Sequence, residues 1–246
     1  MSTEADSPLL AIADDLTVGL RYLHFSHPVA CIYNPLEYAR EGYRAYVIRF
    51  GAPPKETLIL GMNPGPWGMA QTGVPFGEVH HVREWLGIDE IVGRPANELP
   101  SRPVHGFSCP RSEVSGARVW GWARDAFETP ERFFAHHFVG NYCPLIFFDK
   151  TGRNLTPDRL KAAEKERLFA ACDAALRRTI LHLRACRVVA LGRFAFSRAL
   201  DAASGMGLDV LSVPHPSPAN PAANRGWATL MSAAFSAGRR PPPVAP

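Results

Sequence analysis

The sequence predicts an α/β domain in which a largely parallel sheet is covered on both faces by helices. Short apolar runs rich in β-branched residues recur along the chain and end in Gly, Asn or Pro, which is typical of strands buried on both faces. Stretches with apolar residues at helical spacing lie between several of these runs. Alternating strands and helices favour a parallel sheet, and such sheets bind ligands just beyond the carboxyl ends of their strands.

Five apolar runs are predicted to be strands, and in chain order they are 45–50, 57–61, 138–142, 187–192 and 208–213. A long helix is predicted from Pro157 to about Arg184, because Thr156 can cap a helix and Pro157 suits its first turn. Shorter helices are predicted at 7–25, 78–87, 116–127, 131–136, 193–203 and 221–236. No linker or repeat interrupts this pattern. We therefore expect one domain over residues 1–237, followed by a disordered Pro-rich tail over 238–246.

Composition narrows the class of protein. The 246 residues are 46% hydrophobic and 20% charged, which is ordinary for a globular chain and too apolar for a disordered one. The formal net charge is only +4, so charge alone does not predict a nucleic-acid partner. No apolar run reaches the roughly 18–20 residues of a membrane helix, and the acidic start does not match a signal peptide. We expect an intracellular protein, cytoplasmic or associated with a nucleoid or nucleus, without a membrane partner.

The cysteines and histidines do not predict a metal site. The five cysteines include no Cys-x-x-Cys pair, which favours buried thiols over a zinc site or a disulfide framework. The adjacent pairs His80–His81 and His136–His137 lack the spacing of metal ligands. We therefore expect neither a metal nor another cofactor.

A segment rich in glycine and proline follows the predicted strand at 57–61. Residues 61–77 (GMNPGPWGMAQTGVPFG) contain five glycines, three prolines and no ionisable side chain, which indicates a tight, rigid loop. Chemistry in this loop must therefore use amides, backbone N–H groups and aromatic faces. The Walker phosphate-loop motif is absent, and Pro64 and Pro66 interrupt a dinucleotide-binding fingerprint.

Two other predicted strands end in polar side chains. Four prolines between residues 214 and 221 hold His215 at the edge of the sheet where ligands bind, so we expect His215 to be functional. Asn141 lies near the end of the strand at 138–142. There it is either a turn residue or a hydrogen-bonding reader of a planar ligand.

These motifs resemble the single-strand-selective monofunctional uracil-DNA glycosylases. The resemblance rests on residues 61–77, on HPSPANP and NRGW between 215 and 227, and on shorter strings that begin at Tyr33 and Asn141. It covers about residues 20–235 and implies a single α/β domain with a central four-stranded, mainly parallel sheet flanked by helices. It also implies excision of uracil from single- and double-stranded DNA, and of 5-substituted uracils such as 5-hydroxymethyluracil. The product is an abasic site, no cofactor takes part, and we expect a monomer.

The resemblance assigns roles to the side chains of a base pocket. Phe76 would stack on a base flipped out of the helix, and Asn141 would pair with the O4 and N3–H edge of uracil. Asn63 would position the attacking water, although an amide cannot act as a general base. His215 would donate a hydrogen bond to uracil O2 as negative charge develops.

Two further positions complete the implied pocket. The N–H of Met62 would help to bind the base. Gly65 would leave room at carbon 5 of the base, where strictly uracil-specific relatives have a larger side chain that excludes thymine. Thymine would then be rejected by an ordered water that a methyl group cannot replace.

The resemblance makes the stretch from Pro216 to Trp227 a wedge that enters the duplex and keeps the base flipped out. Relatives carry Arg where this chain has Ala219, which removes a cation from the tip of the wedge and leaves duplex affinity and opposite-base preference open. Trp67 stands where relatives have Phe. The DNA-binding residues predicted in the wedge are Pro216, Ser217, Pro218, Ala219, Asn220, Asn224 and Arg225.

Three other functions compete with uracil excision. A glycosylase for another deaminated base, such as hypoxanthine, is compatible with Asn63 in place of a carboxylate. A catalytically silent module that binds damaged DNA is disfavoured, because it would need neither Asn63 nor His215. A nucleosidase acting on small molecules is disfavoured by the segment that resembles a wedge.

Overall fold

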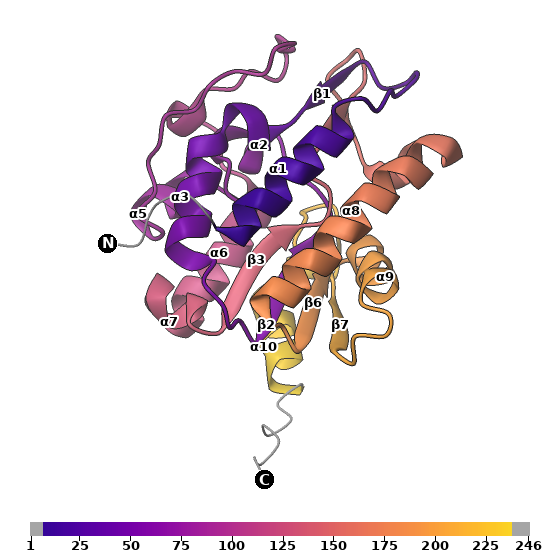
Figure 1. Ribbon diagram of the computed structural model, residues 1–246. Helices are drawn as coiled ribbons and strands as arrows, with labels where there is room; N and C mark the ends of the chain where they lie inside the picture. Colours follow the sequence, from indigo (N-terminus) through magenta and orange to yellow (C-terminus); the bar gives the residue numbers. More distant parts are fainter. Residues whose placement is uncertain (1–6, 238–246) are drawn as a thin grey trace.

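Four parallel strands form the central sheet. The computed structural model describes residues 7–237, and Figure 1 shows the arrangement of their elements. All neighbouring strands in this sheet are parallel, which confirms the predicted α/β fold. The predicted tail at 238–246 lies outside the described residues. The strand order is β3-β2-β6-β7, with bounds β2 Thr57–Gly61, β3 His137–Asn141, β6 Arg187–Leu191 and β7 Asp209–Val213.

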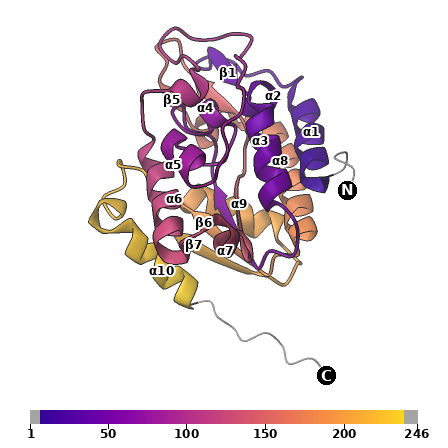
Figure 2. The same cartoon turned by 90° about the vertical axis from the view of Figure 1, so that its left-hand side faces the viewer.

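Helices cover both faces of the sheet. One layer contains α1 (Pro8–Leu20), α8 (Ala162–Leu183) and α9 (Arg193–Ala202). The other contains α5 (Val79–Glu84), α6 (Val114–Phe127), α7 (Pro130–Phe134) and α10 (Trp227–Ala237). Figure 2 shows α1 and α8 on one side of the molecule and α5, α6 and α10 on the other. Within residues 7–237, no helix is long and apolar enough to cross a membrane.

The segment 45–50, predicted as a strand, is instead the end of α3 (Arg40–Phe50). The buried residues of α3 follow helical spacing, and Ile48 is 48% exposed. A short apolar run fits a strand and a helix face equally well, so its pattern could not distinguish them. Tyr46 of α3 explains the burial, since its hydroxyl donates to Val139 O (2.9 Å) and accepts from Val139 N (3.2 Å). Helix α3 thus supplies hydrogen-bond partners to the backbone of Val139, which lies at the edge of the sheet.

A second sheet was not predicted. β1 (Cys31–Tyr33), β4 (Ile146–Phe148) and β5 (Asn154–Leu155) pair in that order, and all pairs are antiparallel. Strands of two or three residues are too short to show alternation. The structure also contains α2 (Pro35–Tyr38), α4 (Met69–Thr72) and three short 3₁₀ helices, η1 (Gly106–Ser108), η2 (Pro157–Arg159) and η3 (Ala223–Arg225).

The long helix begins later than predicted. Residues 157–159 form η2, the side chain of Thr156 makes no capping hydrogen bond, and α8 starts at Ala162. The Glu164 carboxylate takes the capping role, because it accepts from Lys161 N (3.2 Å) and Ser26 N (2.7 Å). The expectation of buried thiols is confirmed for four cysteines but wrong for Cys186, which is exposed.

The centre of the sheet should dominate stability. Ile59 in β2 is fully buried, whereas Ile91 in a loop is 86% exposed. We expect Ile59→Ala to lower the free energy of unfolding by about 2–5 kcal/mol, because it leaves a cavity between two helical layers. The matched substitution Ile91→Ala should change it by less than about 0.5 kcal/mol. Urea unfolding monitored by circular dichroism measures both values, and equal losses would contradict this account of the core.

Candidate active site

The candidate site lies at the carboxyl edge of the parallel sheet, where β2, β3 and β7 end. Parallel register pairs Gly61 at the end of β2 with Asn141 at the end of β3. A Cβ atom on Gly61 would lie 2.5 Å from Asn141 Oδ1 and 2.6 Å from Phe76 Cε2. Glycine at this position therefore allows the amide and the aromatic ring to approach one another, as predicted for two groups that share a planar ligand.

The Asn141 amide is incompletely satisfied. Its Nδ2 donates only to Met69 Sδ (3.3 Å), a weak acceptor, and its buried Oδ1 has no hydrogen-bond partner. A buried carbonyl oxygen without a partner is costly, so this amide is suited to a ligand edge with one donor and one acceptor. The hydroxyl of the next residue, Tyr142, donates to Asp173 Oδ1 (2.8 Å) and accepts from Arg198 Nε (3.1 Å). These bonds fix the backbone that carries Asn141.

Phe76 closes one face of the site. Its φ of +54° is unusual for a residue with a side chain, and it is held in place by its carbonyl, which accepts from Trp120 Nε1 (3.0 Å). A Cβ atom on Gly116 of α6 would collide with the same carbonyl. The Phe76 ring centroid lies 6.4 Å from that of His215. The ring and the imidazole predicted to act together are therefore neighbours.

His215 is held as a neutral donor. Its Nδ1 accepts from Ser217 N (3.1 Å), and because a backbone N–H can only donate, the ring proton must be on Nε2. Burial lowers the pKa of His215 to about 4. The ring also depends on Gly192, whose φ is +94° and whose missing side chain lets the His215 Cβ approach. His215 can thus present an N–H to a developing anion without carrying charge itself.

Asn63 is oriented by one of its two polar atoms. Its Nδ2 donates to Leu145 O (3.2 Å), which leaves Oδ1 as the acceptor on the open side of the amide. In this orientation Asn63 Oδ1 can accept a hydrogen bond from a bound water. Met62 lies between Gly61 and Asn63, and its carbonyl accepts from Cys143 N (2.9 Å). The role predicted for the Met62 N–H stays a prediction.

The predicted wedge divides into supporting and exposed residues. Pro216 is buried, Asn220 Nδ2 donates to His215 O (3.1 Å), and Asn224 Nδ2 donates to Pro218 O (2.8 Å). Ser217 supports the imidazole through its N–H, as described above. Of the residues predicted there to bind DNA, Pro218, Ala219, Asn224 and Arg225 are exposed.

Sequence reasoning missed two side chains, Arg118 in α6 and Glu113 just before it. Arg118 Nη1 donates to Pro216 O (2.9 Å), and its Nη2 donates to Asn224 Oδ1 (2.9 Å), so it ties the wedge to the helix. Glu113 comes just before α6, and its carboxyl occupies the space that Cβ atoms on Gly65 and Gly68 would need. The loop has no ionisable side chain of its own, but the fold brings the Glu113 carboxyl against it. The sequence around Arg118 and Glu113 carries no signal that distinguishes either residue from a surface residue.

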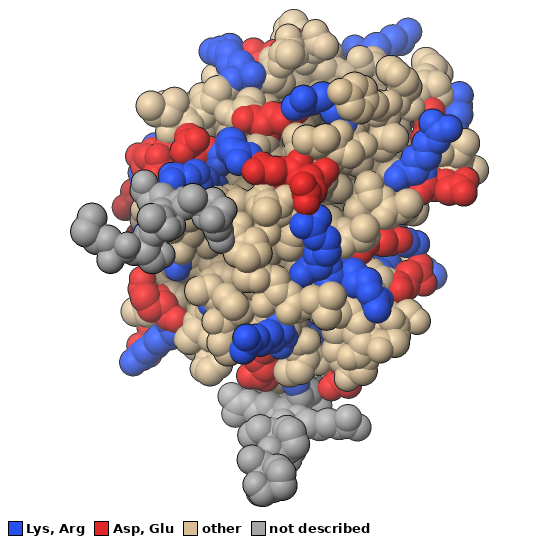
Figure 3. Space-filling model, in the orientation of Figure 1, with Lys and Arg blue, Asp and Glu red and all other residues tan. Residues whose placement is uncertain are grey.

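Trp67, in the same loop, lies beneath two cations. The guanidinium carbon of Arg111 is 4.5 Å from its ring centroid, and that of Arg102 is 5.5 Å away. These cation–π contacts place two arginines beside the site. Figure 3 shows, by contrast, that acidic and basic side chains alternate over the face formed by α1 and α8, where Arg178 pairs with Asp15. That face has no large surface of one sign.

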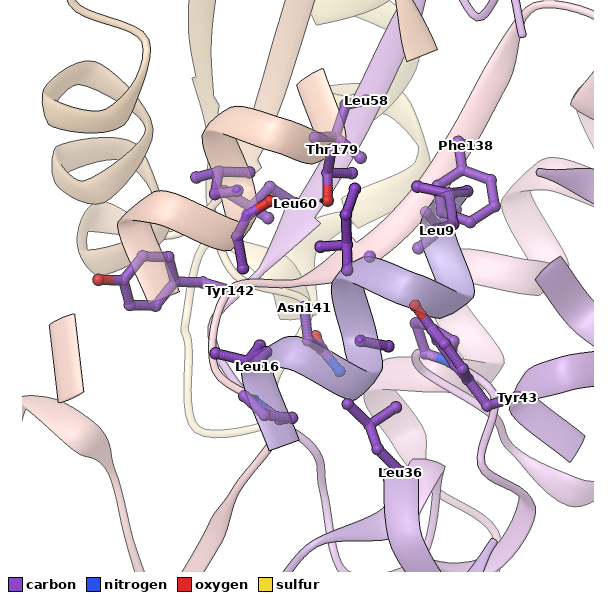
Figure 4. A pocket seen from close by; sticks show the side chains of 18 of the residues that line it. Leu9, Leu16, Leu36, Tyr43, Leu58, Leu60, Phe138, Asn141, Tyr142 and Thr179 are labelled. Atoms are coloured by element: carbon purple, nitrogen blue, oxygen red, sulfur yellow. Dashed lines mark hydrogen bonds between the residues drawn. The ribbon is translucent and has the colours of Figure 1, made fainter. Parts of the chain in front are cut away.

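A separate apolar cavity of about 70 Å³ lies behind Asn141. Figure 4 shows Asn141 among apolar side chains of α1 and β2, including Leu9, Leu16, Leu58 and Leu60. Neither Asn63 nor His215 lines this cavity. Of the residues predicted to form the base pocket, only Asn141 lines it. Within residues 7–237, no cluster of three or more His, Cys, Asp or Glu side chains could hold a metal ion.

Comparison with known proteins agrees with this geometry. A family model of the uracil DNA glycosylase superfamily matches residues 48–235. The rat single-strand selective monofunctional uracil-DNA glycosylase is 53% identical over 216 residues, which are 87% of this chain and 78% of the relative. The mouse protein of the same name is 52% identical over 214 residues, or 86% of this chain and 77% of the relative.

A solved structure supports the fold. The crystal structure of wild-type Pedobacter heparinus SMUG2 superposes with a TM-score of 0.66, covering 92% of this chain and 97% of the other. Sequence identity in this pair is 18%, so the likeness concerns the architecture alone.

The charge state of His215 can be measured directly. Burial depresses its pKa from 6.5 to about 4, so we expect a neutral ring with the proton on Nε2 from pH 8 down to pH 5. A depressed pKa in a base means that its contribution to stability is complete above pH 6.5 and is lost as the pH falls toward 4. Nitrogen-15 NMR of the imidazoles, with His215→Gln to identify the signal, would show this. An imidazolium at pH 6 would contradict it.

The tether between Arg118 and the wedge predicts a change in local opening. We expect Arg118→Ala to speed amide hydrogen exchange at Ser217 and Asn220 by about tenfold or more, because charge-assisted bonds to Pro216 O and Asn224 are lost. The control is Arg124→Ala on the same helix, because the guanidinium of Arg124 donates to Asp125 Oδ1 and not to the wedge. Exchange that rises equally in both variants would show that the effect is not due to the tether.

Proposed function

The chain belongs to the uracil-DNA glycosylase superfamily, and from this membership we propose that Asn63 and His215 hydrolyse the N-glycosidic bond of uracil in DNA. Identity of about half over most of the chain to monofunctional uracil-DNA glycosylases makes it a DNA glycosylase. The observation that carries the proposal is the neutral His215, whose ring centroid lies 6.4 Å from that of Phe76, at the same edge of the sheet as the unsatisfied Asn141 amide.

Recognition of the base uses Phe76 and Asn141. The target atom is inaccessible in a stacked duplex, so the nucleotide must rotate out into the site. The Phe76 ring stacks on the base, while Asn141 Nδ2 donates to O4 and Oδ1 accepts from N3–H. Uracil thereby satisfies the Asn141 oxygen that lacks a partner in the free protein. Cytosine presents the opposite pattern on this edge and would leave two buried groups unpaired.

Bond cleavage divides between the two catalytic residues. Asn63 Oδ1 accepts a hydrogen bond from a water and holds its oxygen toward C1′. As the C1′–N1 bond breaks, its electron pair moves into the uracil ring, and the Nε2–H of His215 donates to O2. The water oxygen bonds to C1′ and its proton leaves to solvent or to the departing uracil. Because His215 stays neutral, no proton has to be transferred to the ring before cleavage.

The proposal also covers the strand state of the DNA and the bases that are accepted. We include single- and double-stranded DNA, and uracils with a substituent at carbon 5 such as 5-hydroxymethyluracil, because the resemblance to single-strand-selective monofunctional uracil-DNA glycosylases implies this range. The room predicted beside Gly65 is not empty, since the Glu113 carboxyl lies where a Cβ of residue 65 would be. The N–H of Met62 contacts the base. The exposed wedge residues, Pro218, Ala219, Asn224 and Arg225, contact the DNA. Hypoxanthine presents the same donor and acceptor edge as uracil, so it is the natural competing substrate.

The test is excision in EDTA on an end-labelled oligonucleotide with a single uracil, either single-stranded or paired with G. Alkali-dependent scission reports the abasic site. We expect Asn63→Ala and His215→Ala each to reduce the single-turnover rate by about 10²-fold or more, as loss of one preorganised hydrogen-bonding group does. His24→Ala and Asn97→Ala, at exposed positions, serve as matched controls with wild-type rates.

Three outcomes are informative. Equal losses in the control variants would contradict the assigned roles. Absence of scission with uracil but presence with hypoxanthine would move the enzyme to another deaminated base. Tight binding of the uracil oligonucleotide without any scission would indicate a silent damage-binding module.

A further inference from the structure

We propose that Trp67, Arg102 and Arg111 form a phosphate clamp, in which two guanidinium groups over one indole ring bind the backbone of the DNA strand beside the base pocket. The inference rests on the proposed function for its partner, because DNA supplies the phosphate. It goes beyond that function by assigning a binding surface that lies outside both the base pocket and the predicted wedge.

The two guanidinium groups of the clamp share one aromatic ring. The guanidinium carbon of Arg111 lies 4.5 Å from the ring centroid of Trp67, and that of Arg102 lies 5.5 Å from it. A guanidinium over a ring offers its flat face to the ring and keeps the N–H groups at its edge as donors. Charged N–H forks of this kind match the oxygens of a phosphate.

Neither arginine of the clamp has a carboxylate partner within residues 7–237. Other exposed arginines do pair with acids, as Arg94 does with Glu98 (3.0 Å). The side chain of Arg102 donates through Nε to Gly152 O (2.6 Å), which leaves both of its Nη groups as donors. The guanidinium of Arg111 contacts the Trp67 ring and makes no hydrogen bond within the described residues. The clamp therefore has charge and donors that the protein itself does not satisfy.

The carboxyl group of Glu113 does not neutralise the clamp. It lies where Cβ atoms of Gly65 and Gly68 would be, and it forms no ion pair within residues 7–237. Burial and the Glu78 carboxylate raise the pKa of Glu113 to about 7, so the group is largely protonated below that pH. Both guanidinium charges are therefore available to an anion.

Gln71 connects the glycine-rich loop to residues 102–105. Its buried side chain donates through Nε2 to Pro66 O (2.9 Å) and Pro103 O (3.1 Å), and its Oε1 accepts from His105 N (2.8 Å). These bonds hold the backbone on both sides of the clamp in place. A site that is ordered before binding loses little conformational entropy when the ligand arrives.

The backbone of a DNA strand is the anion that fits the position of the clamp. Trp67 lies in the same loop as Asn63, which follows the carboxyl end of β2, so the clamp is adjacent to the site proposed for the flipped nucleotide. The predicted wedge contains one cation, Arg225, and the net charge of the chain is only +4. Phosphate contacts supply affinity that does not depend on sequence and position a protein on its strand. The clamp thus holds the strand while the pocket reads the base.

The experiment measures binding to a labelled single-stranded oligonucleotide without uracil, by fluorescence anisotropy over a series of NaCl concentrations. Arg102→Gln and Arg111→Gln each remove one charge, whereas Arg111→Lys keeps the charge but removes the planar fork. The matched control is Arg184→Gln. Arg184 is exposed, forms no ion pair within the described part of the chain, and lies between α8 and the start of β6, at the opposite edge of the sheet.

We expect Arg102→Gln and Arg111→Gln each to weaken binding by about 3- to 10-fold at low salt. Each should also reduce the slope of log Kd against log [NaCl] by about 0.7, the value for one phosphate contact on a single strand. Arg111→Lys should keep the slope and lose part of the affinity, and Arg184→Gln should leave the slope unchanged.

Wild-type slopes in both glutamine variants of the clamp would overturn the inference. An equal decrease in Arg184→Gln would also overturn it, because the effect would then come from net charge alone. Neither result bears on uracil excision, which is measured separately on the oligonucleotide that contains uracil. Absence of excision by the wild type, together with the expected slopes, would instead overturn the proposed function and leave the clamp in place.

Discussion

The candidate site depends on the register of two parallel strands. Pairing of Gly61 with Asn141 brings the ends of β2 and β3 together, and everything that follows these strands is built from that point. Because Gly61 has no side chain, Asn141 and Phe76 both approach its Cα. The amide and the aromatic ring therefore converge on one space, and neither could do so beside a larger residue. A shift of this register by one residue would turn Asn141 to the other face of the sheet.

The chemistry that results uses neutral groups held in fixed orientations. Asn63 is oriented by the hydrogen bond that its Nδ2 donates to Leu145 O. His215 is oriented by the hydrogen bond that its unprotonated Nδ1 accepts from Ser217 N. In the proposed reaction, neither side chain has to change its charge during bond cleavage. Fixed dipoles stabilise developing charge without reorganisation, which is how such a site can act without a strong base. Prolines on both sides of His215 and the tether from Arg118 keep the imidazole in this orientation.

Helix α6 and the residue before it connect the parts of the site. Arg118 reaches the wedge, Trp120 holds the carbonyl of Phe76, and Glu113 reaches the glycine-rich loop. Two side chains of α6 and one from the residue before it thus contact the predicted wedge, Phe76 and the glycine-rich loop. A rigid helix can keep these groups at fixed separations, which loops alone could not do.

The sequence by itself determined the parallel sheet, the strand ends and the loops beyond them, because buried strands and Gly- and Pro-rich turns leave local patterns. Motifs of contiguous residues also pointed to Asn63, Phe76, Asn141 and His215 through their resemblance to a known family. The sequence could not place 45–50, since a short apolar run fits a strand as well as the face of α3. Only the tertiary structure decided that Arg118 holds the wedge and that Glu113 lies against Gly65 and Gly68. Such contacts join residues about 50 to 100 positions apart, and the separation leaves no local pattern.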